Sequence, residues 1–70
     1  MTTKPQKYRD VARFLRSRGW ERTRQRGSHE VWSRPGGGAT FTLAQHRGEV
    51  SPGLIRQLQA AFDDTPSEWN

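Results

Sequence analysis

Apolar residues recur with helical spacing near both ends of the chain. Within residues 6–18 they follow the i, i+3, i+4, i+7 pattern of one helical face, at Tyr8, Val11, Ala12 and Leu15. This spacing predicts a first helix over about residues 6–18, and Gly19 follows it where a helix commonly ends. A second helix is predicted to begin at Pro52, because Ser51 suits the N-cap and proline suits the first helical position.

The segment between these helices predicts three short strands. Residues 20–26 are polar, residues 29–34 mix apolar and polar positions, and residues 39–44 alternate clearly, with Phe41 and Leu43 on one face. Short turns rich in glycine separate the three strands, and residues linking the last strand to the second helix are expected to form a loop. The pattern therefore predicts an antiparallel meander.

The predicted fold class is α+β, in the order α-β-β-β-α, with both helices on one face of a three-stranded antiparallel sheet. The other sheet face stays open. Side chains alternate along a strand, so if Trp32 faces the helices, His29 and Val31 face the open side. The opposite phase would expose Trp32. Burying a large indole contributes more free energy than burying a valine, so we expect the phase in which Trp32 faces the helices. The expected core residues are Tyr8, Val11, Leu15, Trp20, Trp32, Phe41, Leu43, Leu54, Ile55, Leu58 and Phe62.

Seventy residues predict a single domain, with a core of about residues 7–62 and a flexible acidic tail at residues 63–70. A domain of this size has a thin core, and without cysteine it cannot use a disulfide. The longest apolar run, residues 60–62, is too short for a signal peptide or a membrane helix. We therefore expect a cytoplasmic protein.

The charge is strongly asymmetric along the chain. All 12 Lys and Arg residues lie within residues 1–56, whereas three of the seven acids lie in the last eight residues. Ten of the 12 bases are arginine, which favours bidentate contact with phosphate. This balance predicts nucleic acid or another polyanion as a partner.

The run Gly27-Ser28-His29 is the strongest candidate for chemistry. Imidazole moves protons near neutral pH, and two small residues let a phosphate approach the backbone. The surrounding cations predicted to contact phosphate are Arg22, Arg24, Arg26, Arg34 and Arg47. A proton-transfer group beside cations that bind phosphate suits a metal-free ribonuclease, because RNA carries its own nucleophile, the 2′-hydroxyl. A plain nucleic-acid binder with an incidental histidine would look similar.

His46 is a candidate second acid or a residue that orders its loop. Two histidines without a third ligand at a useful spacing do not predict a metal site, and no cofactor is expected. Arg9, Arg13 and Arg16 form a basic ridge along the first helix. This ridge could contact RNA or an acidic surface of a protein partner.

The order of these features resembles the HicA family of toxin mRNA interferases. The resemblance rests on Gly19-Trp20 after a helix, Gly27-Ser28-His29 opening a strand, Trp32, and His46 followed by Ser51-Pro52-Gly53-Leu54. It covers about residues 8–62. Many members carry proline two residues before the second histidine, where this chain has Ala44.

The resemblance implies a fold similar to double-stranded-RNA-binding domains and an endoribonuclease that cleaves mRNA and blocks translation in a stress response. It implies that His29 is catalytic, that Gly27 and Ser28 precede it as the small residues of the motif, and that a HicB-like antitoxin neutralises the toxin. Two other readings stay open. One is a non-catalytic RNA-binding module of the same fold, and the other is a protein-interaction domain with a basic surface.

Overall fold

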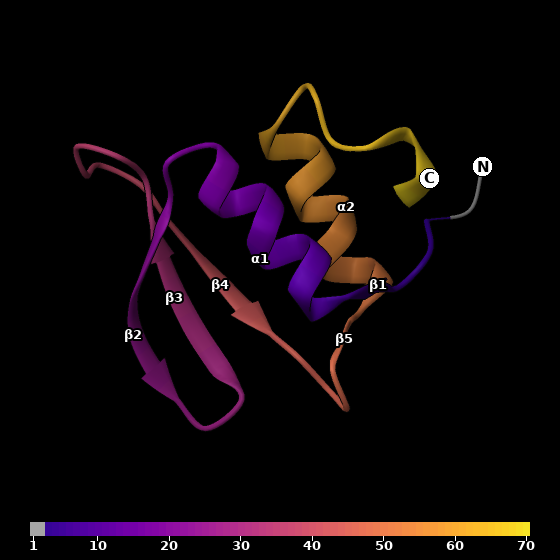
Figure 1. Cartoon of the computed structure of the whole chain (residues 1–70), viewed down its shortest axis with the longest axis horizontal. Coiled ribbons are helices and arrows are strands. Elements are labelled where there is room, and N and C mark those ends of the chain that lie inside the picture. Colours follow the sequence, from indigo (N-terminus) through magenta and orange to yellow (C-terminus); the bar gives the residue numbers. More distant parts are fainter. Residues whose placement is uncertain (1–2) are drawn as a thin grey trace.

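The computed structural model describes residues 3–70 and contains two helices, five strands and one 3-10 helix (Figure 1). In chain order they are β1 (Gln6–Lys7), α1 (Tyr8–Ser17), β2 (Glu21–Arg26), β3 (His29–Ser33), β4 (Thr40–Ala44), β5 (Glu49–Val50), α2 (Pro52–Ala61) and η1 (Ser67–Trp69). Within the described residues, no helix is long and apolar enough to cross a membrane.

The α+β arrangement with a three-stranded antiparallel sheet is confirmed. The main sheet has the order β2-β3-β4, and both pairs of neighbours are antiparallel. The predicted helix ends are also confirmed. Gly19 has a φ of +82°, which suits a residue just past α1, and the Ser51 hydroxyl accepts a hydrogen bond from the Leu54 N–H at the start of α2.

The core lies between the two helices and one face of the sheet. Val11 and Leu15 of α1, Ile55 and Leu58 of α2, and Trp32 of β3 are all fully buried in one cluster. The predicted phase of β3 is therefore confirmed, because Trp32 faces the helices. Five of the expected core residues are only partly buried and pack around this cluster: Tyr8, Trp20, Phe41, Leu54 and Phe62.

A second, two-stranded sheet joins the two segments that flank the main fold. The chain pairs Gln6 with Val50 and Lys7 with Glu49, and the N–H of Tyr8 donates to the carbonyl of Gly48. Residues 6–7 were expected to be helical and residues 45–50 to be a loop. The pairing corrects both expectations, because it satisfies backbone groups at the start of α1 and brings Val50 into the core.

The C-terminal segment differs from the expected flexible tail. Trp69 is only 2% exposed, and its ring lies 5.4 Å from that of Phe14 in an edge-on arrangement. The carbonyl of Trp69 accepts a hydrogen bond from the N–H of Lys4, and Arg18 forms an ion pair with Asp64. In Figure 1 this segment (yellow) leaves the end of α2 and runs back alongside that helix toward the N-terminal segment. A core this small gains from covering Phe14 with a large aromatic ring.

Replacing Trp69 with alanine should lower the free energy of unfolding by about 3–5 kcal/mol, because the change empties a site filled by a buried aromatic side chain. Urea unfolding followed by circular dichroism measures the loss. Glu68→Ala is the matched control, since Glu68 is exposed and adjacent, and it should shift the stability by less than about 0.5 kcal/mol. Equal free energies of unfolding for the parent and Trp69→Ala would show that the C-terminal segment does not stabilise the core.

Candidate active site

His29 is the first residue of β3 and lies on the sheet face that the helices leave open. It is exposed, and it pairs directly with Arg26 on β2 and Ala44 on β4. The two-residue turn before it begins with Gly27, whose φ of +60° is a conformation that glycine adopts without strain. Nothing lies within 4 Å of the position a Gly27 side chain would occupy. The turn therefore leaves free space beside the histidine.

Two arginines of β2 share the face of His29. Residues directly opposite each other in an antiparallel sheet lie on one face, so Arg26 faces the side of His29 and Arg24 faces the side of Val31. The same face carries Thr40 and Thr42 of β4, both exposed. The open face therefore combines one histidine, two cations and a row of small hydroxyl groups.

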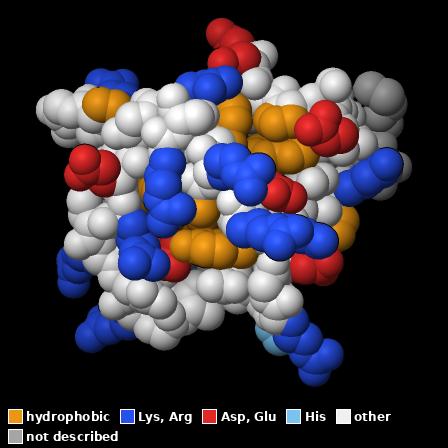
Figure 2. All heavy atoms as spheres, in the orientation of Figure 1, with side chains coloured by type: hydrophobic (Ala, Val, Ile, Leu, Met, Phe, Trp, Pro, Cys, Tyr) orange, Lys and Arg blue, Asp and Glu red, His pale blue; other side chains and the backbone are white. Residues whose placement is uncertain are grey.

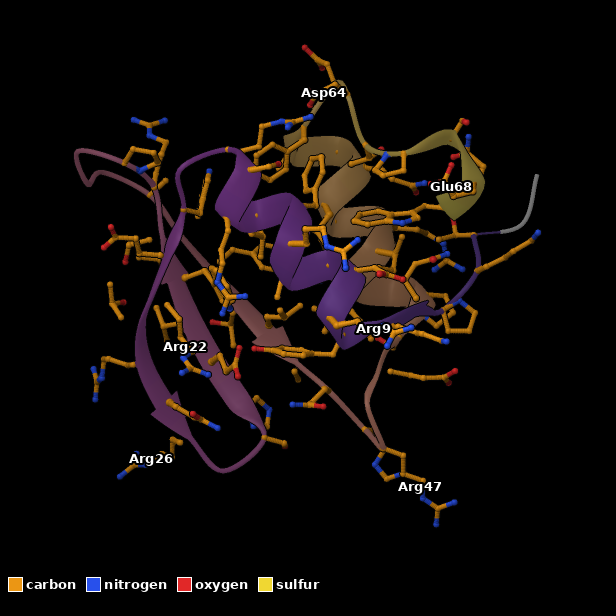
Figure 3. All side chains as sticks on the ribbon, viewed as in Figure 1. Arg9, Arg22, Arg26, Arg47, Asp64 and Glu68 are labelled. Atoms are coloured by element: carbon orange, nitrogen blue, oxygen red, sulfur yellow. The ribbon has the colours of Figure 1, made fainter. Side chains whose placement is uncertain are left out.

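Arg22 lies on the opposite face, toward the helices. It pairs with Trp32, and its Nη1 atom donates to the Glu30 Oε2 atom at 3.2 Å. Figure 3 shows its side chain between β2 and α1, whereas Arg26 extends from the far end of β2. The structure therefore separates Arg22 from Arg24 and Arg26, with which the sequence grouped it.

Beneath the open face, Glu30 is a buried charged residue at the centre of a polar cluster. It is 2% exposed, and its Oε1 and Oε2 atoms accept from the Tyr8 hydroxyl at 2.6 and 2.8 Å. The Trp32 indole N–H also donates to Oε1 at 3.0 Å, and Arg22 completes the set. A carboxylate taken out of water needs such donors, because an unpaired buried charge costs several kcal/mol.

The same cluster perturbs Tyr8. Burial raises the pKa of the Tyr8 phenol above its usual value of 10.0, and the hydrogen bond to Glu30 and the nearby carboxylate charge raise the pKa further. Arg22 opposes these effects by lowering the pKa. Burial disfavours the charged phenolate, and the two effects of Glu30 reflect the cost of placing a second negative charge beside its carboxylate. The phenol therefore acts as a fixed hydrogen-bond donor at neutral pH.

The remaining predicted site residues follow β3 or β4 in the chain and do not belong to the pairing between β2 and the start of β3. Arg34 follows the other end of β3, about 16 Å from His29 along an extended strand. Arg47 lies at the tip of the loop between β4 and β5, with a φ of +53° (Figure 3). His46 exchanges backbone hydrogen bonds with Glu49 at 2.8 and 3.0 Å and so closes that loop. It stands two residues beyond Ala44, the partner of His29.

The basic ridge of α1 is solvent-exposed on the helix side of the molecule. Arg9, Arg13 and Arg16 are all exposed, and the guanidinium of Arg16 lies 5.2 Å from the centre of the Trp32 ring. Figure 2 shows Lys and Arg side chains gathered over α1 on this face. The molecule thus carries two basic surfaces, one around His29 and one along α1.

Sequence reasoning missed Glu30 and the hydroxyl of Tyr8. The signal for Glu30 was present, because a residue two positions before Trp32 on the same strand must share its buried face. A buried glutamate requires donors, and the tyrosine on the apolar face of the first helix offers one. The bulge that turns Arg22 toward Glu30 has no comparable signal in the sequence.

Together, the fold and the site define a small basic α+β domain with an exposed histidine and two arginines on an open sheet face. Residues 8–61 match the model of a protein family described as the HicA toxin of bacterial toxin-antitoxin. The chain therefore belongs to the HicA toxin family and is a toxin of a toxin–antitoxin pair. No curated protein and no solved structure gives a significant match to the chain.

Replacing Tyr8 with phenylalanine should lower the free energy of unfolding by about 1–3 kcal/mol at pH 7, because the buried carboxylate loses a donor. The raised pKa of Tyr8 means that the folded state holds the phenolic proton more tightly than the unfolded state. Its contribution is therefore complete below pH 10 and disappears as the pH rises through the raised pKa.

Urea unfolding of parent and Tyr8→Phe proteins from pH 7 to pH 11 measures this difference. The gap in stability should be constant at neutral pH and should shrink above about pH 10. A gap that stays constant over the whole range would contradict the coupling between Tyr8 and Glu30.

Proposed function

We propose that this toxin is an endoribonuclease that cleaves mRNA and thereby inhibits translation, and that a HicB-like antitoxin neutralises it. The observation that carries the proposal is the exposed His29, which pairs directly with Arg26 on a sheet face that no other element of the described chain covers. The family supports a toxin, and the histidine beside cations supports RNA as its target.

The proposed reaction uses the nucleophile that RNA itself supplies. The 2′-oxygen of a nucleotide attacks the adjacent phosphorus while the bond from phosphorus to the 5′-oxygen breaks. His29 takes the proton of the 2′-hydroxyl or gives a proton to the leaving 5′-oxygen, and a second group or water serves the other step. A positioned acid–base group contributes about 10²–10⁴-fold to such a rate.

Arg24 and Arg26 supply the positive charge that this reaction needs. Charge develops on the phosphoryl oxygens as the 2′-oxygen attacks, and fixed cations and amides stabilise it. Arg26 directly opposes His29, and Gly27 and Ser28 leave the backbone of the turn accessible to a phosphate. Arg47 and Arg34 are more distant and would contact flanking nucleotides. The proposed mechanism needs no metal ion.

The open face also suits the proposed antitoxin. A protein that covers Thr40, Thr42 and His29 would block access of RNA to the site without disturbing the core on the other side of the sheet. One surface would then serve substrate and inhibitor in turn.

Replacing His29 with alanine or glutamine should lower the rate of RNA cleavage by about 10²–10⁴-fold while the circular dichroism spectrum stays unchanged. The parent should retain its activity in EDTA. An RNA with 2′-deoxynucleotides at the cleaved positions should resist the parent, because it lacks the nucleophile. Cleavage by His29→Ala at the parent rate would overturn the mechanism. An RNA bound and protected by the parent, with no turnover, would instead identify a binding module.

His46→Ala distinguishes the two roles open to the second histidine. Because its backbone, rather than its side chain, closes the loop, we expect less than about a threefold change in cleavage rate from loop ordering alone. A loss of 10²-fold or more would assign His46 as the second proton-transfer group.

The two arginines of the open face should contribute to RNA binding more than Arg22 does. In a His29→Ala background that keeps the RNA intact, Arg24→Gln and Arg26→Gln should each weaken binding and reduce the salt dependence by about 0.7 in log–log slope. Arg22→Gln is the matched comparison on the same strand. Its salt slope should stay near the parent value, because Arg22 faces Glu30. Equal slopes for all three variants would contradict the assignment of faces.

A further inference from the structure

Strand β2 contains an irregularity that decides which way its arginines face. Its pairing with β3 is regular from Arg26 to Arg24, then shifts by one residue, so that Arg22 and not Thr23 opposes Trp32. In a regular strand Arg22, Arg24 and Arg26 would all lie on one face, since they are spaced by two. The bulge at Thr23 moves Arg22 to the other face.

Contacts on both faces hold this bulge. On the helix side, Arg22 forms its ion pair with Glu30, whose side chain is only 3% exposed. On the open side, the Thr23 hydroxyl lies 3.0 Å from the Ser33 hydroxyl and donates to the carbonyl of Val31 at 3.3 Å. The hydroxyl contacts are exposed and join neutral groups. The ion pair is therefore the stronger of the two attachments.

The competing arrangement is the regular register. There Thr23 would oppose Trp32, and Arg22 would oppose Ser33 on the open face. Glu30 would keep the Tyr8 and Trp32 donors but would lose its only cation among the described contacts. A buried carboxylate without a compensating charge is strongly disfavoured, so this register is penalised by Glu30.

We propose that Glu30 is a positioning residue that selects the bulged register of β2 through its ion pair with Arg22. By this means it limits the arginines of β2 on the face of His29 to Arg24 and Arg26. The consequence for RNA rests on the proposed function, since it takes the face of His29 as the RNA-binding face. The choice of register itself is independent of that function.

Engineered cysteine pairs can report the register directly, because the chain has no cysteine of its own. Glu21 opposes Ser33 only in the bulged register, so the pair Glu21→Cys with Ser33→Cys closes a disulfide there. In the regular register the two cysteines would point to opposite faces. The reference pair Arg24→Cys with Val31→Cys lies between the bulge and the turn and is opposed in both registers.

The measurement is the rate of disulfide closure with oxidised glutathione, for each pair in the parent and in Glu30→Gln. Glutamine keeps the shape and the acceptor oxygen but removes the charge. We expect the 21/33 pair to close about tenfold more slowly in Glu30→Gln, the ratio for losing one hydrogen bond to a charged group. The 24/31 pair should close at the parent rate.

Two further variants keep the test decisive if Glu30→Gln folds poorly. Arg22→Gln removes the same ion pair from its exposed side and should slow the 21/33 pair to a similar extent, whereas Arg22→Lys keeps the charge and should restore most of the rate. An unchanged 21/33 rate in folded Glu30→Gln and Arg22→Gln would overturn the proposal. A parallel slowing of both cysteine pairs would also overturn it, because it would show general loosening of the hairpin.

This experiment uses no RNA, so it separates the two claims. A toxin that fails to cleave RNA but shows the selective slowing would refute the proposed function and retain the positioning role of Glu30. A toxin that cleaves RNA but shows no selective slowing would support the proposed function and refute the positioning role of Glu30.

Discussion

The carboxylate of Glu30 is the constraint on which the rest of this structure depends. A negative charge in the core of a 70-residue domain is stable only if donors from several elements converge on it. Here they come from Tyr8 at the start of α1, Arg22 on β2 and Trp32 on β3. The requirement to satisfy one group therefore ties the first helix to two strands of the sheet, in addition to the apolar contacts of the core.

This tie gives the two faces of the sheet different chemistry. The helix side contains the satisfied carboxylate, the indole of Trp32 and the arginine turned toward them. The open side contains His29 with Arg24 and Arg26, and no acidic side chain lies directly opposite these three residues; Glu21 shares this face but opposes Ser33, at the far end of the hairpin from His29. A carboxylate on the open face beside these arginines would compete with phosphate for the same cations. Placing Glu30 underneath leaves the positive charge of the open face available to a polyanion.

The thin core explains the role of the C-terminal segment. The family match ends at residue 61, yet Trp69 is buried against Phe14, and Phe62 packs edge-on against the same ring. The added aromatic surface covers the apolar side of α1 that the sheet does not reach. A domain that buries only about 60% of its unfolded surface benefits from each such side chain.

The sequence by itself determined the two helices, the three strands of the main sheet and the phase of its central strand. Helical spacing, the Ser51 cap and the position of Gly19 are local signals, and Trp32 placed His29 on the open face through simple alternation. Only the tertiary structure decided that Arg22 lies on the opposite sheet face from Arg24 and Arg26. It also decided that residues 6–7 pair with residues 49–50 and that Trp69 packs on Phe14. Those outcomes depend on contacts between distant parts of the chain. A bulge or a strand pairing is selected by the group it satisfies across the fold, and that group is not a neighbour in sequence.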